Sequence, residues 1–445
     1  MARSQHRQKR RSRILRLRSR RGTGSMAVDR YDVAVVGGGS AGVAAAIAAA
    51  RSGARTLLLE KGPCLGGAAT LRNVLTYCGL YTLGEQPRRA VMGVADEVLA
   101  GLRRLDAVTG PQRHRGVFVV FDPEAVKLVL DALCAEAGVD VRFGAFVCGA
   151  TRANGGIVDL SWQDHGGRRT IAARAFVDAS GEGDLAHFAG AATRYGNDGA
   201  VNLGTLATRF GGIPRDVVVT ADQLTAAVQA ARAAGRGPFS KDRSVLTRLP
   251  LSGDMVCYLA SEDYDPRDAK SRSAAERRGR QQAWAYLEVI KSLPGCANAY
   301  LASTGPEFGT REARHIEAAY RLAWQDVVDG RPQADSIALG AWGVEWHDRK
   351  TLQSSFIYPP DKGAYEIPLR CLVSRDTANL FAAGRVVDAD REAGASLRVM
   401  GTAFATGQAA GVAAAMFADR DKVDSDGVRQ VLREQGALIK VSELF

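Results

Sequence analysis

The 445-residue sequence predicts an α/β fold, in which a discontinuous Rossmann-like domain is interrupted by an α+β domain on a mixed sheet. Three observations predict this fold. Within 31–60, an apolar strand, a glycine turn, a helix and a second apolar strand follow one another. From about 195 to 355 this alternation stops, and short strands separated by turns take its place. After residue 378 the first pattern returns, because an apolar strand precedes a long helix of small residues.

The first β-α-β unit contains the spacing Gly37-x-Gly39-x-x-Gly42, directly after the strand 33–36. This spacing is the fingerprint of dinucleotide binding when it opens a helix in a β-α-β unit. The first glycine permits a tight turn, the second lets the backbone approach a pyrophosphate, and the third lets helix and strand pack closely. The N-terminus of the helix then faces the phosphates with free N–H groups. Glu60 ends the second strand, where it is placed to accept hydrogen bonds from a ribose.

The net charge of +11 comes almost entirely from residues 1–25, which hold ten Lys and Arg and no acid. The rest of the chain carries about +1, so it gives no electrostatic argument for nucleic-acid binding. We expect this basic tail to be disordered. Its composition is compatible with three interpretations: a segment that contacts nucleic acid or an anionic membrane, an organellar transit peptide, or a non-functional extension with translation starting at Met26. We favour the non-functional extension. No apolar run approaches the ~20 residues that span a bilayer.

The seven cysteines are scattered, and none has CxxC, zinc or iron–sulfur spacing. This pattern predicts reduced thiols in a cytoplasmic protein, with no metal and no redox-active disulfide.

The remaining elements of the first half alternate between strands and helices, and Asn154-Gly155-Gly156 predicts a hairpin turn. They are a helix at 87–105, a strand at 116–121, a helix from Asp122-Pro123 to Gly138, and strands at 139–143, 146–153, 157–162 and 171–177. In the insertion we expect strands at 203–210, 244–249 and 255–259 and helices at 220–234 and 266–292.

The last strand, 379–383, is followed by a helix that we expect to pack closely on the sheet through Gly407 and Gly411. The predicted organisation is therefore a basic tail, a first cofactor-domain segment, a substrate or cap domain, and a second cofactor-domain segment with the C-terminal tail. Their respective limits are 1–25, 26–194, 195–360 and 361–445.

Several segments together resemble the FAD-dependent oxidoreductases of the glutathione-reductase-like superfamily. The resemblance is strongest to an uncharacterised subgroup distantly related to fumarate reductase and succinate dehydrogenase flavoproteins, and it covers nearly all of 28–417. The segments are the fingerprint unit, CLGGAAT from Cys64, VDASGEGDLAHFAGA from Val177, TREARHI from Thr310, YEIPLRCLV from Tyr365, and NLFAAGR to QAAGVAAA from Asn379.

This resemblance implies an FAD-binding domain. In it the three fingerprint glycines approach the pyrophosphate, Glu60 binds the ribose, and the N–H groups that open the last helix point at the flavin pyrimidine, where they stabilise negative charge. Arg385 replaces an acid that relatives often carry, so we expect contact there through the backbone. The implied FAD-binding residues are Gly37, Gly39, Ser40, Ala41, Gly42, Glu60, Lys61, Gly66, Gly67, Ala68, Thr70, Asp178, Ser180, Gly181, Gly384, Arg385, Arg398, Met400, Gly401 and Thr402.

The flavin carries the redox step, so the protein must supply a proton acceptor and a cation for the substrate. His347 in GVEWHD is our candidate general base, and the alternative is a hydrogen-bonded sheet histidine. Arg391 lies where relatives commonly carry histidine, and we expect it to bind an anion or substrate.

Two arginines lie in GTREARHI, and we expect Arg311 or Arg314 to bind a substrate carboxylate or carbonyl. The alternative is an ion pair with Glu312 or Glu317.

These features predict an FAD-dependent oxidoreductase that transfers a hydride between a small organic substrate and the flavin. Because no second nucleotide fold is visible, we expect no dedicated NAD(P)H domain. Electrons would then leave to oxygen, a quinone or a partner protein, and the sequence does not distinguish among these acceptors. The alternatives are a flavin-dependent monooxygenase or halogenase and, in another class, an RNA-binding flavoprotein that uses the basic tail. Nucleic acid and a membrane span are not expected as part of the function, whereas a homo-oligomer is compatible with the sequence.

Overall fold

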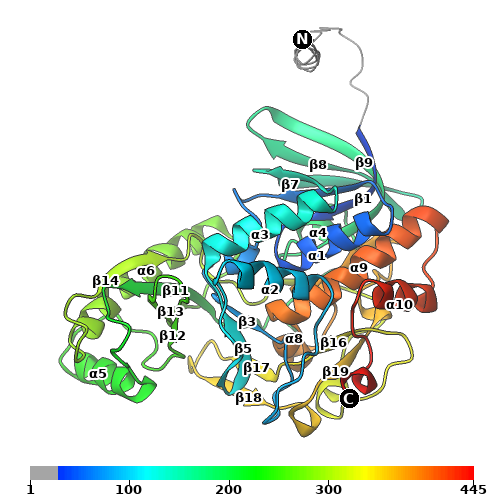
Figure 1. The fold of residues 1–445 in the computed structure, drawn as a ribbon. Helices are drawn as coiled ribbons and strands as arrows, with labels where there is room; N and C mark the ends of the chain where they lie inside the picture. Colours follow the sequence, from blue (N-terminus) through cyan, green and yellow to red (C-terminus); the bar gives the residue numbers. More distant parts are fainter. Residues whose placement is uncertain (1–28) are drawn as a thin grey trace, which may run out of the picture.

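The computed structural model describes residues 29–445 (Figure 1), so the basic tail predicted at 1–25 lies outside the described residues. Its main sheet has seven strands in the order β6-β2-β1-β9-β8-β7, with β20 also paired to β9. β6, β2, β1, β9 and β20 are parallel, whereas β7 and β8 form the predicted hairpin and run antiparallel. The bounds are β1 Asp29–Val36, β2 Thr56–Glu60, β6 Asp140–Phe143, β7 Phe146–Ala153, β8 Gly156–Asp164, β9 Gly167–Asp178 and β20 Leu380–Ala382.

The two ends of the described chain meet in this domain. β20 extends the sheet beside β9, and α9 (Met400–Arg420) lies against α1 (Ser40–Arg51). A Cβ atom on Gly407 would lie 2.1 Å from the carbonyl oxygen of Ala41, and one on Gly411 would lie 2.1 Å from that of Ala45. We predicted that this helix packs closely on the sheet through its glycines. The close approach is present, but the helix packs on the fingerprint helix α1, because only hydrogen atoms fit between the two backbones at these glycines. The discontinuous cofactor domain is confirmed.

The insertion has a four-stranded sheet, β12-β13-β11-β14, with α5 and α6 (Figure 1). We predicted a mixed sheet here, but every pairing in it is antiparallel, as the short turn between β12 and β13 favours. A separate hydrophobic core within 206–308 stabilises this unit, whereas the apolar residues of 316–372 join the core of the cofactor domain. The bounds are β11 Gly204–Gly211, α5 Ala221–Ala233, β12 Thr247–Arg248, β13 Met255–Glu262, α6 Ala269–Lys291 and β14 Tyr300–Thr304.

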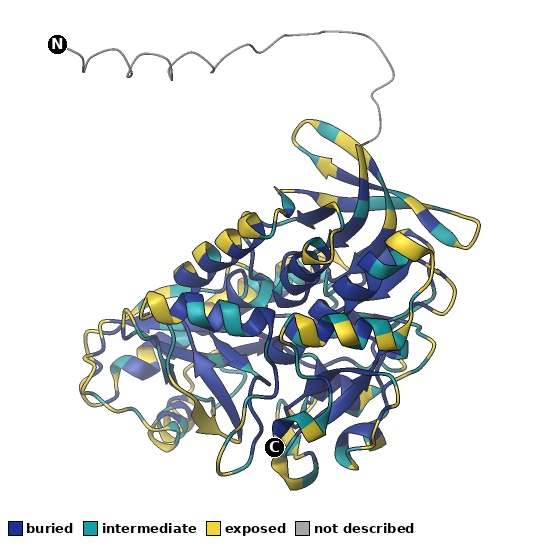
Figure 2. Ribbon diagram, turned by 45° about the vertical axis from the view of Figure 1, so that its right-hand side comes forward, coloured by how far each residue is buried: buried dark blue, intermediate teal, exposed yellow. Residues whose placement is uncertain are grey.

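Smaller elements complete the fold, and Figure 2 shows that exposed residues concentrate on its outer helices and loops. The helix predicted from Pro87 begins only at Val94, because Gly93 adopts a left-handed φ of 66° and Ala90 donates to the carbonyl of Leu80. The remaining elements are β3 Thr76–Cys78, α2 Val94–Arg104, β4 Gln112–His114, β5 Gly116–Val120, α3 Pro123–Glu136, α4 Asp184–Phe188, β10 Thr193–Tyr195, β15 Arg314–Ile316, α7 Trp324–Val328, β16 Ser336–Gly340, β17 Val344–His347, β18 Ser354–Ile357, β19 Tyr365–Pro368, α8 Arg391–Leu397 and α10 Ser425–Glu434.

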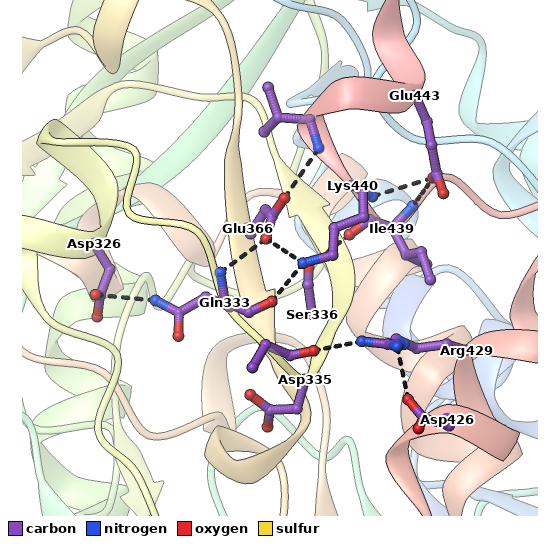
Figure 3. A network of polar contacts seen from close by, with 12 residues as sticks. Asp326, Gln333, Asp335, Ser336, Glu366, Asp426, Arg429, Ile439, Lys440 and Glu443 are labelled. Carbon is purple, nitrogen blue, oxygen red and sulfur yellow. Dashed lines mark hydrogen bonds and ion pairs between the residues drawn. The ribbon is translucent and has the colours of Figure 1, made fainter.

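The C-terminal segment is fixed to the β16–β19 pair by a polar network (Figure 3). The buried carboxylate of Glu366 accepts a hydrogen bond from the backbone of Gln333 at 2.9 Å and pairs with Lys440 Nζ at 2.9 Å. Ser336 donates to the carbonyl of Ile439 at 2.6 Å. Glu366 therefore links three segments that are distant in the sequence.

Replacing Glu366 by alanine should lower the free energy of unfolding by about 3 kcal/mol, because it leaves the Lys440 ammonium without its counter-ion and the buried N–H of Gln333 without its acceptor. The measurement is urea denaturation of the FAD-bound protein. Asp426→Ala is the matched control, since the Asp426–Arg429 pair at 2.6 Å has a carboxylate that is 77% exposed and contributes about 1 kcal/mol or less. Equal effects of the two substitutions would contradict the assignment.

Candidate functional site

Two adjoining cavities lie between the cofactor domain and the insertion. The smaller, of about 110 Å³, lies over the fingerprint, and the larger, of about 310 Å³, is bordered by β3, β17 and loops of the insertion. Ala68, Arg72, Arg385, Arg398 and Met400 line both. The two cavities therefore form one elongated site.

Three glycines shape the floor of the smaller cavity. Gly37 has a φ of 98°, which favours glycine, and Gly39 pairs with Gly66 in a parallel bridge that brings the two glycine loops together. A Cβ atom on Gly39 would meet nothing closer than 3.9 Å, at Gly67, so this position faces the cavity. A Cβ atom on Gly42 would lie 1.7 Å from the carbonyl oxygen of Gly37, so Gly42 serves the packing of helix on turn.

Polar groups of the smaller cavity fit a dinucleotide. The hydroxyl of Ser40, at the start of α1, is buried and has no hydrogen-bond partner within 29–445, and the same holds for Nη1 of Arg385. Both groups can donate to a phosphate, and Ser40 lies at the N-terminus of α1. Glu60 accepts from the backbone N–H groups of Gly38 and Gly62, each at 2.6 Å, which fixes its carboxylate at the cavity wall. Its oxygens keep lone pairs that a ribose hydroxyl can use.

The sequence-based prediction missed an ion-pair network around Glu182. Its carboxylate lies 2.7 Å from Arg385 and 3.2 Å from Arg72, and Arg72 also lies 3.5 Å from Glu307. Burial opposes ionisation, but the guanidinium groups of Arg385 and Arg72 outweigh it and lower the pKa of Glu182 to about 2. Glu182 accepts from Nη2 of Arg385, and Gly384 lines the smaller cavity beside Arg385.

The structure brings most of the predicted cofactor residues together. The members that line the smaller cavity are Gly37, Gly39, Ser40, Ala41, Glu60, Lys61, Gly67, Ala68, Ser180, Gly181, Gly384, Arg385, Arg398 and Met400. Six other predicted residues do not line this cavity: Gly42, Gly66, Thr70, Asp178, Gly401 and Thr402.

These six residues hold the wall in place. Asp178 is fully buried and accepts from Ser180 and from the backbone of Ala186, so it fixes the turn after β9. Thr70 donates to the carbonyl of Leu65 at 2.7 Å, which closes the turn at Gly66. A Cβ atom on Gly401 would lie 2.4 Å from the carbonyl oxygen of Cys78. A Cβ atom on Gly79 would lie 3.1 Å from the hydroxyl oxygen of Thr402, so the same loop packs against both residues.

Arg311 lines the larger cavity, as predicted for a substrate-binding cation. Its Nη1 donates to the carbonyl of Leu203 and, at 2.8 Å, to the hydroxyl of Thr205, and no carboxylate of the described chain pairs with it. Glu312 instead accepts from His315 and Asn202, which removes the alternative of an ion pair with Arg311. Burial, and then the charge of Arg398, lower the pKa of Arg311 to about 9.

The candidate base His347 also lines this cavity, at the end of β17. Its Nε2 lies 3.4 Å from Oε1 of Glu345, while its Nδ1 is enclosed and has no partner among the described residues. Burial and the positive charge of Arg311 lower the pKa of His347 to about 3. Burial opposes ionisation of Glu345, but its contact with His347 and the charge of Arg398 hold its pKa well below the usual range. The pair is thus a carboxylate beside a neutral imidazole.

Two further arginines occupy different surroundings. Arg391 is exposed, pairs with Glu392 at 2.5 Å and lies over the ring of Trp346, so its predicted role in substrate binding gains no support from the structure. Arg314 donates to the carbonyl of Glu182 at 3.1 Å and lies 3.5 Å from Asp184. Neither residue lines the two cavities.

The larger cavity also contains cations and acids that we did not predict, notably Lys241 and Glu345. Burial, and then the charge of Arg311, lower the pKa of Lys241 to about 7. Across 29–445 no group of three or more His, Cys, Asp or Glu is arranged to hold a metal ion. No helix in the same range is long and apolar enough to cross a membrane.

Comparisons with known proteins give the family. Solved structures with a similar fold include a geranylgeranyl bacteriochlorophyll reductase-like protein from Thermoplasma acidophilum (14% identity, 92% of this chain and 83% of that chain, TM-score 0.46). Another is p-nitrophenol 4-monooxygenase PnpA from Pseudomonas putida (12% identity, 91% of this chain and 84% of that chain, TM-score 0.45).

Among curated proteins, the digeranylgeranylglycerophospholipid reductase of Thermoplasma volcanium is 27% identical over 175 residues. The match covers 37% of this chain and 42% of that relative, which is less than half of its length. A family model described as FAD dependent oxidoreductase matches residues 32–434, nearly the whole described chain. The chain therefore belongs to the FAD-dependent oxidoreductase family, with FAD as its cofactor.

Proposed function

We propose that the protein transfers a hydride between FAD and a small organic substrate bound in the larger cavity. The observation that carries this proposal is the junction of the two cavities through shared lining residues, next to a guanidinium without a carboxylate partner and a carboxylate–imidazole pair. Bound FAD supplies the hydride acceptor or donor. The protein supplies binding, orientation and proton transfer.

The residues that would hold FAD follow from the smaller cavity. The N-terminus of α1, with the free hydroxyl of Ser40, would bind the pyrophosphate, and Glu60 would bind the adenosine ribose. Met400 opens α9 at the junction of the cavities, so the N–H groups of this helix would face the flavin.

The Glu345–His347 pair would handle the proton of the substrate. When an alcohol or amine is oxidised, its O–H or N–H proton must leave as its C–H bond gives up the hydride. The neutral imidazole of His347 can accept that proton at Nε2, where the adjacent carboxylate of Glu345 offsets part of the cost that burial and Arg311 impose on the imidazolium. Arg311 would hold a carboxylate or carbonyl of the substrate, since its Nε and Nη2 donate no hydrogen bond within 29–445.

His347→Gln should leave FAD bound and slow flavin reduction by about 100-fold or more, because it removes the proton acceptor. The measurement is anaerobic stopped-flow reduction of the flavin by the most active member of a panel of alcohols and amines. His187→Gln is the control, since His187 is exposed on α4. In the wild type, the rate of flavin reduction should not fall as the pH is lowered through 6.5, because an imidazole with a pKa of about 3 stays neutral there.

Two outcomes would refute the proposal: unchanged flavin reduction in His347→Gln, or an oxygenated product when the wild type turns over in air.

A further inference from the structure

Besides its arginines, the larger cavity contains one lysine, Lys241. This residue comes from the loop between α5 and β12 of the insertion. Its backbone is fixed to α6, because its N–H donates to the hydroxyl of Tyr286 at 3.0 Å and its carbonyl accepts from the same hydroxyl at 2.5 Å. Its Nζ forms no ion pair or hydrogen bond with any residue of 29–445. The backbone thus holds the side chain at the cavity without neutralising its charge.

The charges of the cavity do not balance. Two carboxylates line the cavity beside Lys241, Arg311 and Arg398, and neither forms an ion pair with these cations. Glu345 accepts from the indole N–H of Trp342 at 3.1 Å and contacts His347, and Asp242 accepts from the side-chain amide of Gln229 at 2.9 Å. A partly buried cation without a counter-ion costs stability. The described chain retains three such cations around one cavity, so the complementary charge is expected on the ligand.

Other cations near the cavity differ in this respect. Arg72 and Arg385 share the carboxylate of Glu182, and Arg243 pairs with Asp222 at 3.1 Å near the surface. Arg115 also has no carboxylate partner within 29–445, but it is exposed and donates to the carbonyl and hydroxyl of Ser354. The positive excess that is shielded from solvent therefore belongs to Lys241, Arg311 and Arg398.

Their unused donors suit an oxyanion. The hydrogen bonds of Arg311 use only Nη1, which leaves Nε and Nη2 as a fork of the kind that binds a carboxylate or phosphate. Arg398 donates through Nη2 to the carbonyl of Glu345 at 2.8 Å, while its Nε is buried and has no partner within the described range. Lys241 adds a point charge from the opposite, inserted domain.

We propose that the substrate is an organic anion whose carboxylate or phosphate is bound by Arg311, Arg398 and Lys241, with Lys241 as a specificity-determining residue. This inference rests on the proposed function, because it names the substrate class of the same cavity. It also makes the insertion part of the binding site, since Lys241 lies on a loop of that unit.

Binding should depend on pH through Lys241. A pKa lowered to about 7 means that the ammonium is charged below that pH and loses its charge as the pH rises through it, so anion affinity should fall in the same direction. A bound anion raises this pKa in return. The other titratable and charged groups that line the same cavity are Arg72, Cys78, His114, Arg115, Asp242, Arg243, Tyr258, Arg311, Glu345, His347, Arg385 and Arg398.

The experiment titrates the FAD-loaded full chain with sodium acetate and, separately, with inorganic phosphate, at constant ionic strength and at pH 6 and pH 8.5. Binding is followed by the change in flavin absorbance. For the wild type we expect dissociation constants about 10-fold higher at pH 8.5 than at pH 6. Lys241→Met should weaken binding at pH 6 by about 10- to 100-fold and abolish the pH dependence.

Two further variants sharpen the test. Lys241→Arg should retain affinity but lose the pH dependence, because guanidinium stays charged at both pH values. Arg243→Met, which removes an exposed cation of the same lining that is paired with Asp222, should leave the pH dependence unchanged. A response to acetate assigns a carboxylate and a response to phosphate assigns a phosphate group, and either supports the proposal.

The proposal is overturned if neither anion binds, or if Lys241→Met binds both as the wild type does. The two proposals fail separately. Reduction of the flavin by neutral substrates without any anion site would refute the anionic substrate and leave hydride transfer standing. Conversely, if anions bind through Lys241 but no candidate substrate reduces the flavin, hydride transfer is refuted and the anion site stands.

Discussion

Replacing Gly39 by valine is expected to yield a folded protein without FAD, whereas replacing Gly42 by alanine is expected to prevent stable folding. Gly39 has extended backbone angles, φ −73° and ψ −175°, that valine adopts readily, and its Cβ would point into open space that the cofactor needs. At Gly42 the added methyl group would lie 1.7 Å from the carbonyl oxygen of Gly37, a backbone atom that has nowhere to move. The two glycines of one fingerprint thus have separable roles.

The measurement compares flavin absorbance per protein, far-ultraviolet circular dichroism and thermal unfolding for both variants. Gly39→Val should weaken FAD binding by about 100-fold or more, with apo-protein stability close to that of the wild type. Gly42→Ala should lower the free energy of unfolding by about 3 kcal/mol or more. A Gly39→Val protein that retains full FAD would show that the pyrophosphate lies elsewhere.

Replacing Arg311 by methionine is expected to reduce kcat/KM by about 100-fold or more without lowering the unfolding temperature. The substrate loses its charge-assisted donors, which typically contribute about 1.5–3 kcal/mol each. The folded protein, however, is relieved of a buried cation without a carboxylate partner, which offsets the lost hydrogen bonds to Leu203 and Thr205. Replacing a functional residue that destabilises the folded state commonly makes the protein more stable and less active.

Arg314→Met is the matched control, three residues along the same segment. Arg314 lies 3.5 Å from the carboxylate of Asp184 and outside both cavities, so its loss should lower stability and spare activity in the protein that still folds. The measurements are steady-state kinetics with the substrate identified by anaerobic reduction, and thermal unfolding monitored by circular dichroism. If Arg311→Met were fully active, Arg311 would be a structural residue.

The sequence predicts the cofactor half of this molecule well, because its requirements are local. Gly37, Gly39 and Glu60 lie within one β-α-β unit, where the chain itself places them around a shared cavity. For Asp178 the structure adds a second role, since a pattern match does not reveal that its carboxylate fixes the turn behind the cavity.

The substrate half depends on contacts between distant segments. Glu345 had a usable signal, since residues two apart on a strand share a face and His347 was already a candidate. Lys241 had none, because it lies in an irregular loop whose position depends on α6 and Tyr286. Glu182 becomes important only when Arg72 and Arg385 converge on it from opposite ends of the domain.

The contact of α1 with α9 also determines when the protein can acquire its cofactor during synthesis. Gly407 and Gly411 pack on Ala41 and Ala45, so the fingerprint helix has no partner for this face until α9 has been synthesised. The insertion, which has its own core, is complete much earlier and can fold first. FAD capture would therefore follow the synthesis of α9, and a chain that stops before Met400 would carry the folded insertion but lack the helix that packs on the fingerprint helix.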